Sequence, residues 1–217
     1  MSVEKTNFLP PYQGEPFLLT PGPLTTAYKV KEAMLKDWGS WDSDFKELTK
    51  LLRTKLLSIL DPTNTTYDCV PIQGSGTYAV EAMLGTFVPR DGKLLVLANG
   101  AYGLRAAQTM EYLGRNFHLF NKGDYLPPRS TEITNILSDD PNITHVLAIH
   151  CETSSGILNP LQEIADAVKS NKRKLLIDSM SAFGAVPLDP KKVDFEAMVS
   201  SANKCIEGVP GFGFVFA

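Results

Sequence analysis

Hydrophobic residues recur at helical spacing in the first third of the chain. The pattern predicts two amphipathic helices, one over about residues 28–38 and the next over about residues 44–60. In both, apolar residues fall three or four positions apart, the period of one face of an α-helix. Ser43 is placed to cap the second helix, and Asp61-Pro62 is placed to end it. Residues 1–27 are rich in proline and are predicted to form an extended arm.

Farther along, short apolar runs alternate with helical segments. Runs that are apolar throughout are typical of strands buried on both faces. The predicted strands are residues 93–100, 116–120, 144–152, 174–181 and 195–204. The predicted helices are residues 77–87, 102–113 and 160–170, the last with Asn159 as its cap and Pro160 in its first turn. This alternation predicts an α/β fold, a three-layer sandwich with a mostly parallel central sheet.

Composition and charge narrow the class of protein. The net charge is −3 and there is no basic block, which argues against a nucleic-acid partner. No apolar run approaches the roughly 20 residues of a membrane span, and the polar start does not resemble a signal peptide. Cys69, Cys151 and Cys205 are widely spaced, which favours reduced thiols in the cytoplasm. The three histidines lack the spacing of metal ligands, so we expect no metal site.

The first candidate binding motif is the stretch QGSGTYAVEAM at residues 73–83. Glycines before a predicted helix let backbone N–H groups converge at the positive end of that helix. Ser75, Gly76 and Thr77 could therefore hold a phosphate, with two hydroxyl groups as further donors. The alternative is an ordinary glycine turn with a Ser or Thr cap, and this segment alone does not separate the two.

Two charged residues stand at the ends of other predicted strands. Asp178 follows a buried apolar run, where a carboxylate is costly unless a cation compensates it; the alternative is a cap or a local turn bond with Ser179 or Ser181. Lys204 lies among small residues, where a desolvated neutral amine could attack a carbonyl group. The alternative is a lysine whose head reaches solvent from a strand end.

A phosphate cradle, an aspartate and a lysine at one edge of a sheet suit a particular cofactor. Pyridoxal 5′-phosphate needs a phosphate site, an anion at its pyridinium nitrogen and a lysine for its aldehyde. Tyr102 could stack on the cofactor ring, and Thr153 could hydrogen-bond its phenolic oxygen. The sequence therefore favours a pyridoxal-phosphate enzyme over a metal enzyme.

The stretches LLTPGPLTT, NGAYGLR, HCETSSGILNP, IDSMSAFGAVPLD and SSANKCIEGVPGFGFV resemble class V aminotransferases of fold type I. More narrowly, they resemble the 2-aminoethylphosphonate–pyruvate transaminase family, from about Phe17 to the last residue. The resemblance implies that Lys204 is the Schiff-base lysine and Asp178 the pyridinium partner, both of them catalytic. It implies a phosphate site of residues 75–77 with Asn203. It also implies a homodimer that converts 2-aminoethylphosphonate and pyruvate, an amino donor and a 2-oxo acid, into phosphonoacetaldehyde and L-alanine.

The resemblance also bears on domain organisation. Members of that family continue into a smaller C-terminal domain, whereas this chain ends at GFGFVFA. We therefore expect residues 28–217 to be the cofactor-binding large domain, without the small domain and its substrate-binding arginine. Two other functions stay open: another class V reaction, of the alanine–glyoxylate, serine–pyruvate or cysteine desulfurase type, or a cofactor-binding module without turnover.

Overall fold

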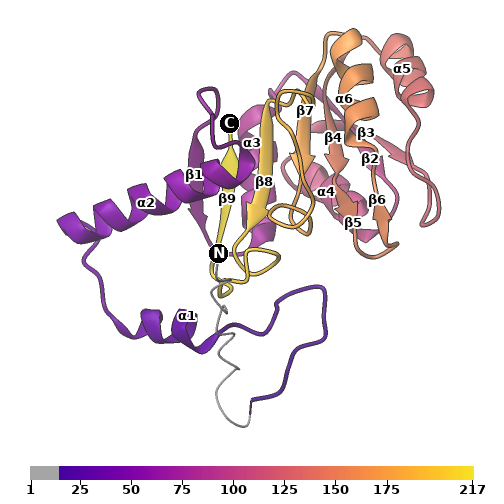
Figure 1. Cartoon of the computed structure of the whole chain (residues 1–217). Helices are drawn as coiled ribbons and strands as arrows, with labels where there is room; N and C mark the ends of the chain where they lie inside the picture. Colours follow the sequence, from indigo (N-terminus) through magenta and orange to yellow (C-terminus); the bar gives the residue numbers. More distant parts are fainter. Residues whose placement is uncertain (1–14) are drawn as a thin grey trace, which may run out of the picture.

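The computed structural model describes residues 15–217, so the first part of the predicted arm, residues 1–14, lies outside the described residues. Its main feature is a seven-stranded sheet with the order β1-β9-β8-β7-β4-β2-β3 (Figure 1). The strands are β1 Cys69–Gln73, β2 Lys93–Ala98, β3 Asn116–Asn121, β4 Ile143–Ile149, β7 Lys174–Asp178, β8 Ala197–Ser201 and β9 Phe212–Phe216. Each predicted strand has a counterpart here, several residues shorter in most cases.

The sheet is mostly parallel, as predicted. Strands β3, β2, β4, β7 and β8 run parallel to one another in the order of the sheet. Strand β9 is antiparallel to both β8 and β1, and the sequence patterns did not predict this ribbon. Only residues 202–211 join β8 to β9, which is too short for the helical crossover that a parallel pair requires.

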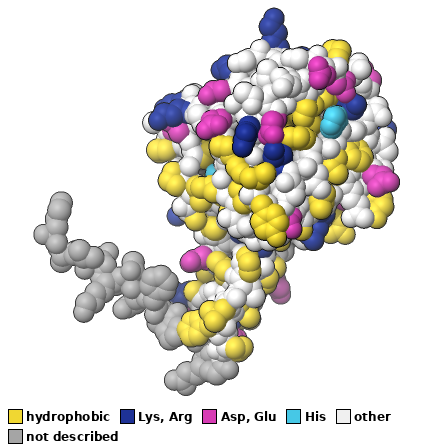
Figure 2. Space-filling model, turned by 90° about the vertical axis from the view of Figure 1, so that its right-hand side faces the viewer, with side chains coloured by type: hydrophobic (Ala, Val, Ile, Leu, Met, Phe, Trp, Pro, Cys, Tyr) yellow, Lys and Arg dark blue, Asp and Glu magenta, His cyan; other side chains and the backbone are white. Residues whose placement is uncertain are grey.

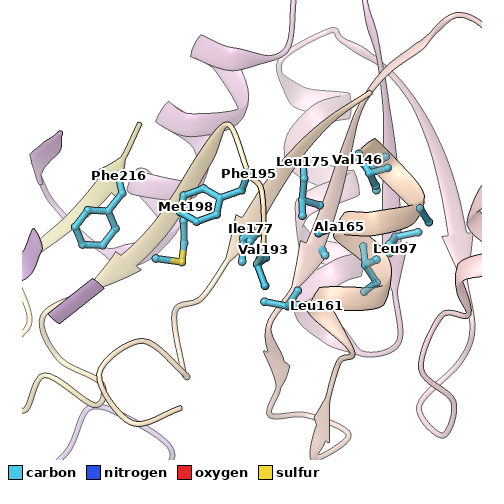
Figure 3. Close-up of a cluster of buried hydrophobic side chains, with 14 of the residues drawn as sticks. Leu97, Val146, Leu161, Ala165, Leu175, Ile177, Val193, Phe195, Met198 and Phe216 are labelled. Carbon is cyan, nitrogen blue, oxygen red and sulfur yellow. The ribbon is translucent and has the colours of Figure 1, made fainter. Parts of the chain in front are cut away.

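Helices cover both faces of the sheet, which confirms the three-layer arrangement. Helices α3 Gly76–Phe87 and α4 Ala101–Tyr112 lie on one face, and α2 Ser43–Leu60, α5 Ser130–Asp139 and α6 Leu161–Ser170 lie on the other. Side chains alternate between the faces along a strand. In β7, Leu175 and Ile177 therefore join the cluster under α2, α5 and α6 (Figure 3), while Leu176 joins the cluster under α3 and α4.

Two predicted helix caps are wrong. Helix α2 begins at Ser43 itself, with Asp42 as its N-cap residue, although the helix ends before Asp61 as predicted. Helix α6 begins at Leu161 with Pro160 as its N-cap residue. The amide of Asn159 instead donates to the Ile149 carbonyl at 2.7 Å, because the chain at that point crosses back over the end of β4.

The N-terminal helices are less well packed than the periodicity predicted. The first predicted helix is split into α1 Tyr28–Glu32 and a 3₁₀ turn η1 Ala33–Leu35, and none of their residues is buried. In α2 only Leu56 and Leu60 are buried; Leu52 and Leu57 pack partly against the core, and Leu48, Leu51 and Ile59 are exposed. Figure 1 shows α1 standing apart from the sheet. The apolar period of α2 is therefore only partly buried against the sheet.

Charged and hydrophobic side chains are mixed on the surface in Figure 2. Figure 2 shows acidic, basic and hydrophobic side chains interspersed on the face that it displays, without a continuous basic stripe. Within residues 15–217, every helix is too short or too polar to span a bilayer.

Candidate active site

A pocket of about 200 Å³ opens where β7 and β8 end and where α3 and α4 begin. Carboxyl ends of parallel strands and the helix starts that follow them converge at one edge of such a sheet, which is where binding sites form. The residues that line the pocket are Ser75, Gly76, Thr77, Val80, Tyr102, Arg105, Ala106, Thr109, Asp178, Met180, Ser201, Asn203 and Lys204. The structure thus brings together seven of the eight predicted site residues.

The start of α3 has the form of an anion cradle. Ser75 is the N-cap residue, and its hydroxyl oxygen accepts the backbone N–H of Tyr78 at 3.4 Å. The first backbone N–H groups of a helix have no acceptor within the helix, so they can bind an anion there. A Cβ atom at Gly76 would lie 2.5 Å from Met180 Sδ, so glycine keeps this wall open. The cap interpretation and the phosphate interpretation of the motif are therefore compatible.

Asp178 ends β7 as a buried carboxyl group, 6% exposed. Its Oδ1 accepts the backbone N–H of Met180 at 2.9 Å, so the local turn bond exists, although with Met180 and not with either predicted serine. Burial raises the pKa of Asp178 to about 6; the Met180 N–H opposes the rise, nearby Glu152 adds to it and Lys204 opposes it. A carboxylate in this position gains from a cation such as a protonated pyridine nitrogen.

Lys204 lies half-buried in the turn after β8. Its Nζ donates to the Gly22 carbonyl at 3.1 Å, so the N-terminal arm reaches the same pocket wall. Gly22 has φ +139°, and a Cβ atom there would lie 2.3 Å from Lys204 Cδ. The N-terminal arm can therefore come this close to Lys204 only with glycine at position 22. An anion cradle, a buried carboxylate and a lysine amine around one pocket fit the phosphate, ring nitrogen and aldehyde of pyridoxal phosphate.

Two other predicted site residues differ in position: Tyr102 lines the pocket and Thr153 does not. Tyr102 lies in the first turn of α4, and the Arg105 guanidinium carbon is 5.2 Å from the centre of its ring. Thr153 lies half-buried between β5 Cys151–Glu152 and β6 Ile157–Leu158, which form a separate two-stranded ribbon. Of the predicted site residues, Thr153 is the one that does not line the described pocket.

Sequence reasoning missed two residues that line the pocket and two buried ionisable residues near Asp178. Arg105 and Thr109 line the pocket because they follow Tyr102 at helical spacing on α4, a signal that the sequence did contain. Buried Glu152 lies in the quoted stretch HCETSSG, where an acidic residue directly after an apolar strand was the available signal. His150 pairs with Ser179 through Nδ1 and Oγ at 2.9 Å, and burial lowers its pKa to about 4. This histidine is therefore neutral near pH 7.

Comparison with known proteins identifies the family of this chain. The family model described as aminotransferase class-V matches residues 63–217. The chain is 68% identical to 2-aminoethylphosphonate–pyruvate transaminase 1 of Paraburkholderia xenovorans (strain LB400), over 95% of this chain and 53% of the relative. It is 66% identical to the transaminase of the same name from Rhizobium meliloti (strain 1021), over 94% of this chain and 53% of the relative. The chain thus spans about half the length of these curated relatives.

Solved structures show the same fold at lower identity. Pyridoxamine-pyruvate aminotransferase from Mesorhizobium loti superposes with a TM-score of 0.80 at 23% identity, over 94% of this chain and 52% of that one. Alanine–glyoxylate aminotransferase from Nostoc sp. gives 0.82 at 23% identity, over 99% of this chain and 57% of that one. At this identity the likeness establishes the fold alone.

Proposed function

Because the chain belongs to the class V aminotransferase family, we propose that it carries the pyridoxal 5′-phosphate site of a transaminase in phosphonate degradation. The amino group of 2-aminoethylphosphonate would pass to pyruvate, which gives phosphonoacetaldehyde and L-alanine. The observation that carries the proposal is the single pocket that gathers residues 75–77, Asp178 and Lys204. The name shared by relatives at 66% and 68% identity supports this choice of substrates.

Each part of the cofactor has candidate partners in the chain. Residues 75–77 bind the phosphate with backbone N–H groups and hydroxyls at the positive end of α3, and Asn203 borders the same pocket. Asp178 holds a proton on the pyridine nitrogen, which is favourable because its buried carboxylate gains a cation there. Tyr102 would contact the ring, and Thr153 would hydrogen-bond the phenolic oxygen.

Proton transfer is assigned to Lys204. When bound, the cofactor supplies an aldehyde that condenses with amines and a ring system that stabilises negative charge on the adjacent substrate carbon. Lys204 Nζ would hold the aldehyde group of the cofactor. The same amine, once the amino donor has displaced it, would be the base that accepts the proton from the carbon that bears the donor nitrogen. The small residues around Lys204 leave space for a substrate at this position.

The wider organisation follows from the same proposal. The chain spans about half the length of its relatives, which supports assigning residues 28–217 to the large, cofactor-binding domain. The exposed apolar faces of α1 and α2 support a homodimer. The three cysteines are free thiols, which supports a cytoplasmic location.

A cofactor titration tests the proposal. The purified chain is titrated with pyridoxal phosphate and followed by its visible absorption, beside Lys204→Ala and the control Lys93→Ala. Lys93 is also half-buried, but it lies at the opposite end of the sheet and pairs with Asp140. We expect a visible band in the unsubstituted chain and in the control, and its loss in Lys204→Ala. An unsubstituted chain without a band would contradict the cofactor assignment.

A transfer assay then tests the reaction. With cofactor bound, 2-aminoethylphosphonate and pyruvate should give alanine that depends on both substrates. Faster transfer from alanine to glyoxylate, or from serine, would reassign the substrates within the family. Bound cofactor without any transfer would identify a binding module.

A further inference from the structure

The carboxylate of Glu152 is buried away from the pocket wall, at the start of α4. The residue is 0% exposed, although an ionisable side chain is costly to bury unless donors surround it. Its Oε2 accepts the backbone N–H groups of Tyr102 at 3.0 Å and Gly103 at 3.2 Å. Both donors belong to the first turn of a helix, where a negative charge is also favoured by the helix dipole. Glu152 is therefore a cap supplied to α4 from a distant part of the sequence.

The second carboxylate oxygen of Glu152 binds Ser154, which also contacts the start of α4. Oε1 accepts the Ser154 hydroxyl at 2.7 Å and the Ser154 backbone N–H at 3.3 Å. The same hydroxyl oxygen accepts the backbone N–H of Ala101 at 2.8 Å. Three successive backbone N–H groups at the start of α4 thus donate to the side chains of Glu152 and Ser154. A Cβ atom at Gly100 would lie 2.4 Å from both Glu152 Cγ and Ser154 Oγ, so glycine is needed for this approach.

We infer that Glu152 is a positioning residue of the pyridoxal-phosphate site, which fixes Tyr102 and Thr153 relative to Asp178 and Lys204. The inference rests on the proposed function and extends it to a residue that does not touch the cofactor. Tyr102 lies in the helical turn that Glu152 caps, and Thr153 lies between the two capping side chains. One buried carboxylate thereby sets the backbone of both residues proposed to contact the cofactor ring and its phenolic oxygen.

Glu132, which caps helix α5, provides a matched control for Glu152. At the start of α5, Glu132 Oε2 accepts the backbone N–H of Arg129 at 3.0 Å, and its other oxygen pairs with Lys122 at 2.6 Å. Helix α5 contributes no residue to the described pocket. Both caps satisfy helix N–H groups, but only the Glu152 cap belongs to a helix that lines the pocket. Glu132→Ala therefore controls for the loss of a cap.

The experiment measures the Kd of pyridoxal phosphate for the whole chain by absorption titration, together with the visible circular dichroism of the bound cofactor. Glu152→Ala should raise the Kd about tenfold and reduce the dichroic band, because Tyr102 is no longer held. Glu152→Gln keeps an acceptor oxygen for the Tyr102 N–H and should restore most of both signals. Glu132→Ala should lower the Tm and leave the Kd unchanged.

A double-mutant cycle separates positioning from general destabilisation. In a chain that already carries Tyr102→Ala, the further change Glu152→Ala should raise the Kd by less than about threefold. The reason is that Glu152 acts on the cofactor mainly by holding Tyr102, and that side chain is already gone. An equal rise in both backgrounds, or an unchanged Kd in Glu152→Ala, would overturn the inference while leaving the cofactor site in place. Ser154→Ala gives a milder test if Glu152→Ala does not fold, with an expected smaller rise in Kd. An unsubstituted chain that binds no cofactor would instead refute the proposed function and, with it, this inference.

Discussion

Asp178→Asn in the cofactor-free chain should stabilise the fold while removing the proposed function. Burial raises the pKa of this carboxyl group from 3.8 to about 6. A carboxyl group with a higher pKa in the folded state than in the unfolded state disfavours folding once both states are ionised. One pKa unit corresponds to about 1.36 kcal/mol, so ionised Asp178 costs the folded chain about 3 kcal/mol above pH 7.

The pH dependence has a definite sign. The folded state binds the proton more tightly, so the cost is absent well below pH 3.8 and grows as the pH rises through about 6. Asn has nearly the same shape and keeps an acceptor oxygen for the Met180 N–H. Asp178→Asn should therefore exceed the unsubstituted chain in unfolding free energy by up to about 3 kcal/mol at pH 8, and by about half of that at pH 5.

Urea unfolding of both chains without cofactor, at pH 5 and pH 8, provides the measurement. Asp140→Asn is the control of opposite sign, because the hydrogen bond from Lys93 lowers the pKa of Asp140. That variant should be less stable than the unsubstituted chain at pH 8, and the difference should vanish in acid. An Asp178→Asn chain that is no more stable at pH 8 would refute the reasoning that a buried, uncompensated carboxylate prepares this site for a cation. The same variant should also bind pyridoxal phosphate more weakly.

Two further predictions concern packing and thiol chemistry. Gly213→Ala should lower the unfolding free energy by about 1–3 kcal/mol in urea, because its Cβ would lie 2.6 Å from Ala79 Cβ, where α3 packs against β9. Gly85→Ala, within α3, should be neutral or stabilising, because a Cβ there would meet Leu113 Cδ1 at 3.9 Å, an ordinary contact. Equal losses in the two variants would contradict the packing argument. Cys69 is fully buried and burial raises the pKa of its thiol to about 12, so mass spectrometry after alkylation of the native chain should find the other two cysteines modified first; early modification of Cys69 would contradict its burial.

The sequence by itself determined the class of fold and predicted most of the residues that line the candidate site. Apolar runs such as residues 175–177 are typical of strands buried on both faces in a covered parallel sheet, so they predicted the layers. Because parallel strands all end at one edge, the same runs also predicted that residues 75–77, Asp178 and Lys204 would meet. These inferences needed only local periodicity and chain direction.

Only the tertiary structure decided the contacts between segments far apart in the chain. The Gly22 carbonyl reaches Lys204 across 182 positions, and Glu152 caps a helix that begins 51 residues earlier at Ala101. The antiparallel pairing of β9 with β1 also joins distant segments. No local pattern encodes such pairs, because a backbone N–H group can donate to any well-placed oxygen, and the folded chain alone sets which oxygen lies there. The partial burial of α2 has the same explanation. Periodicity predicts that a helix has a buried face, but it does not predict which part of the protein covers that face.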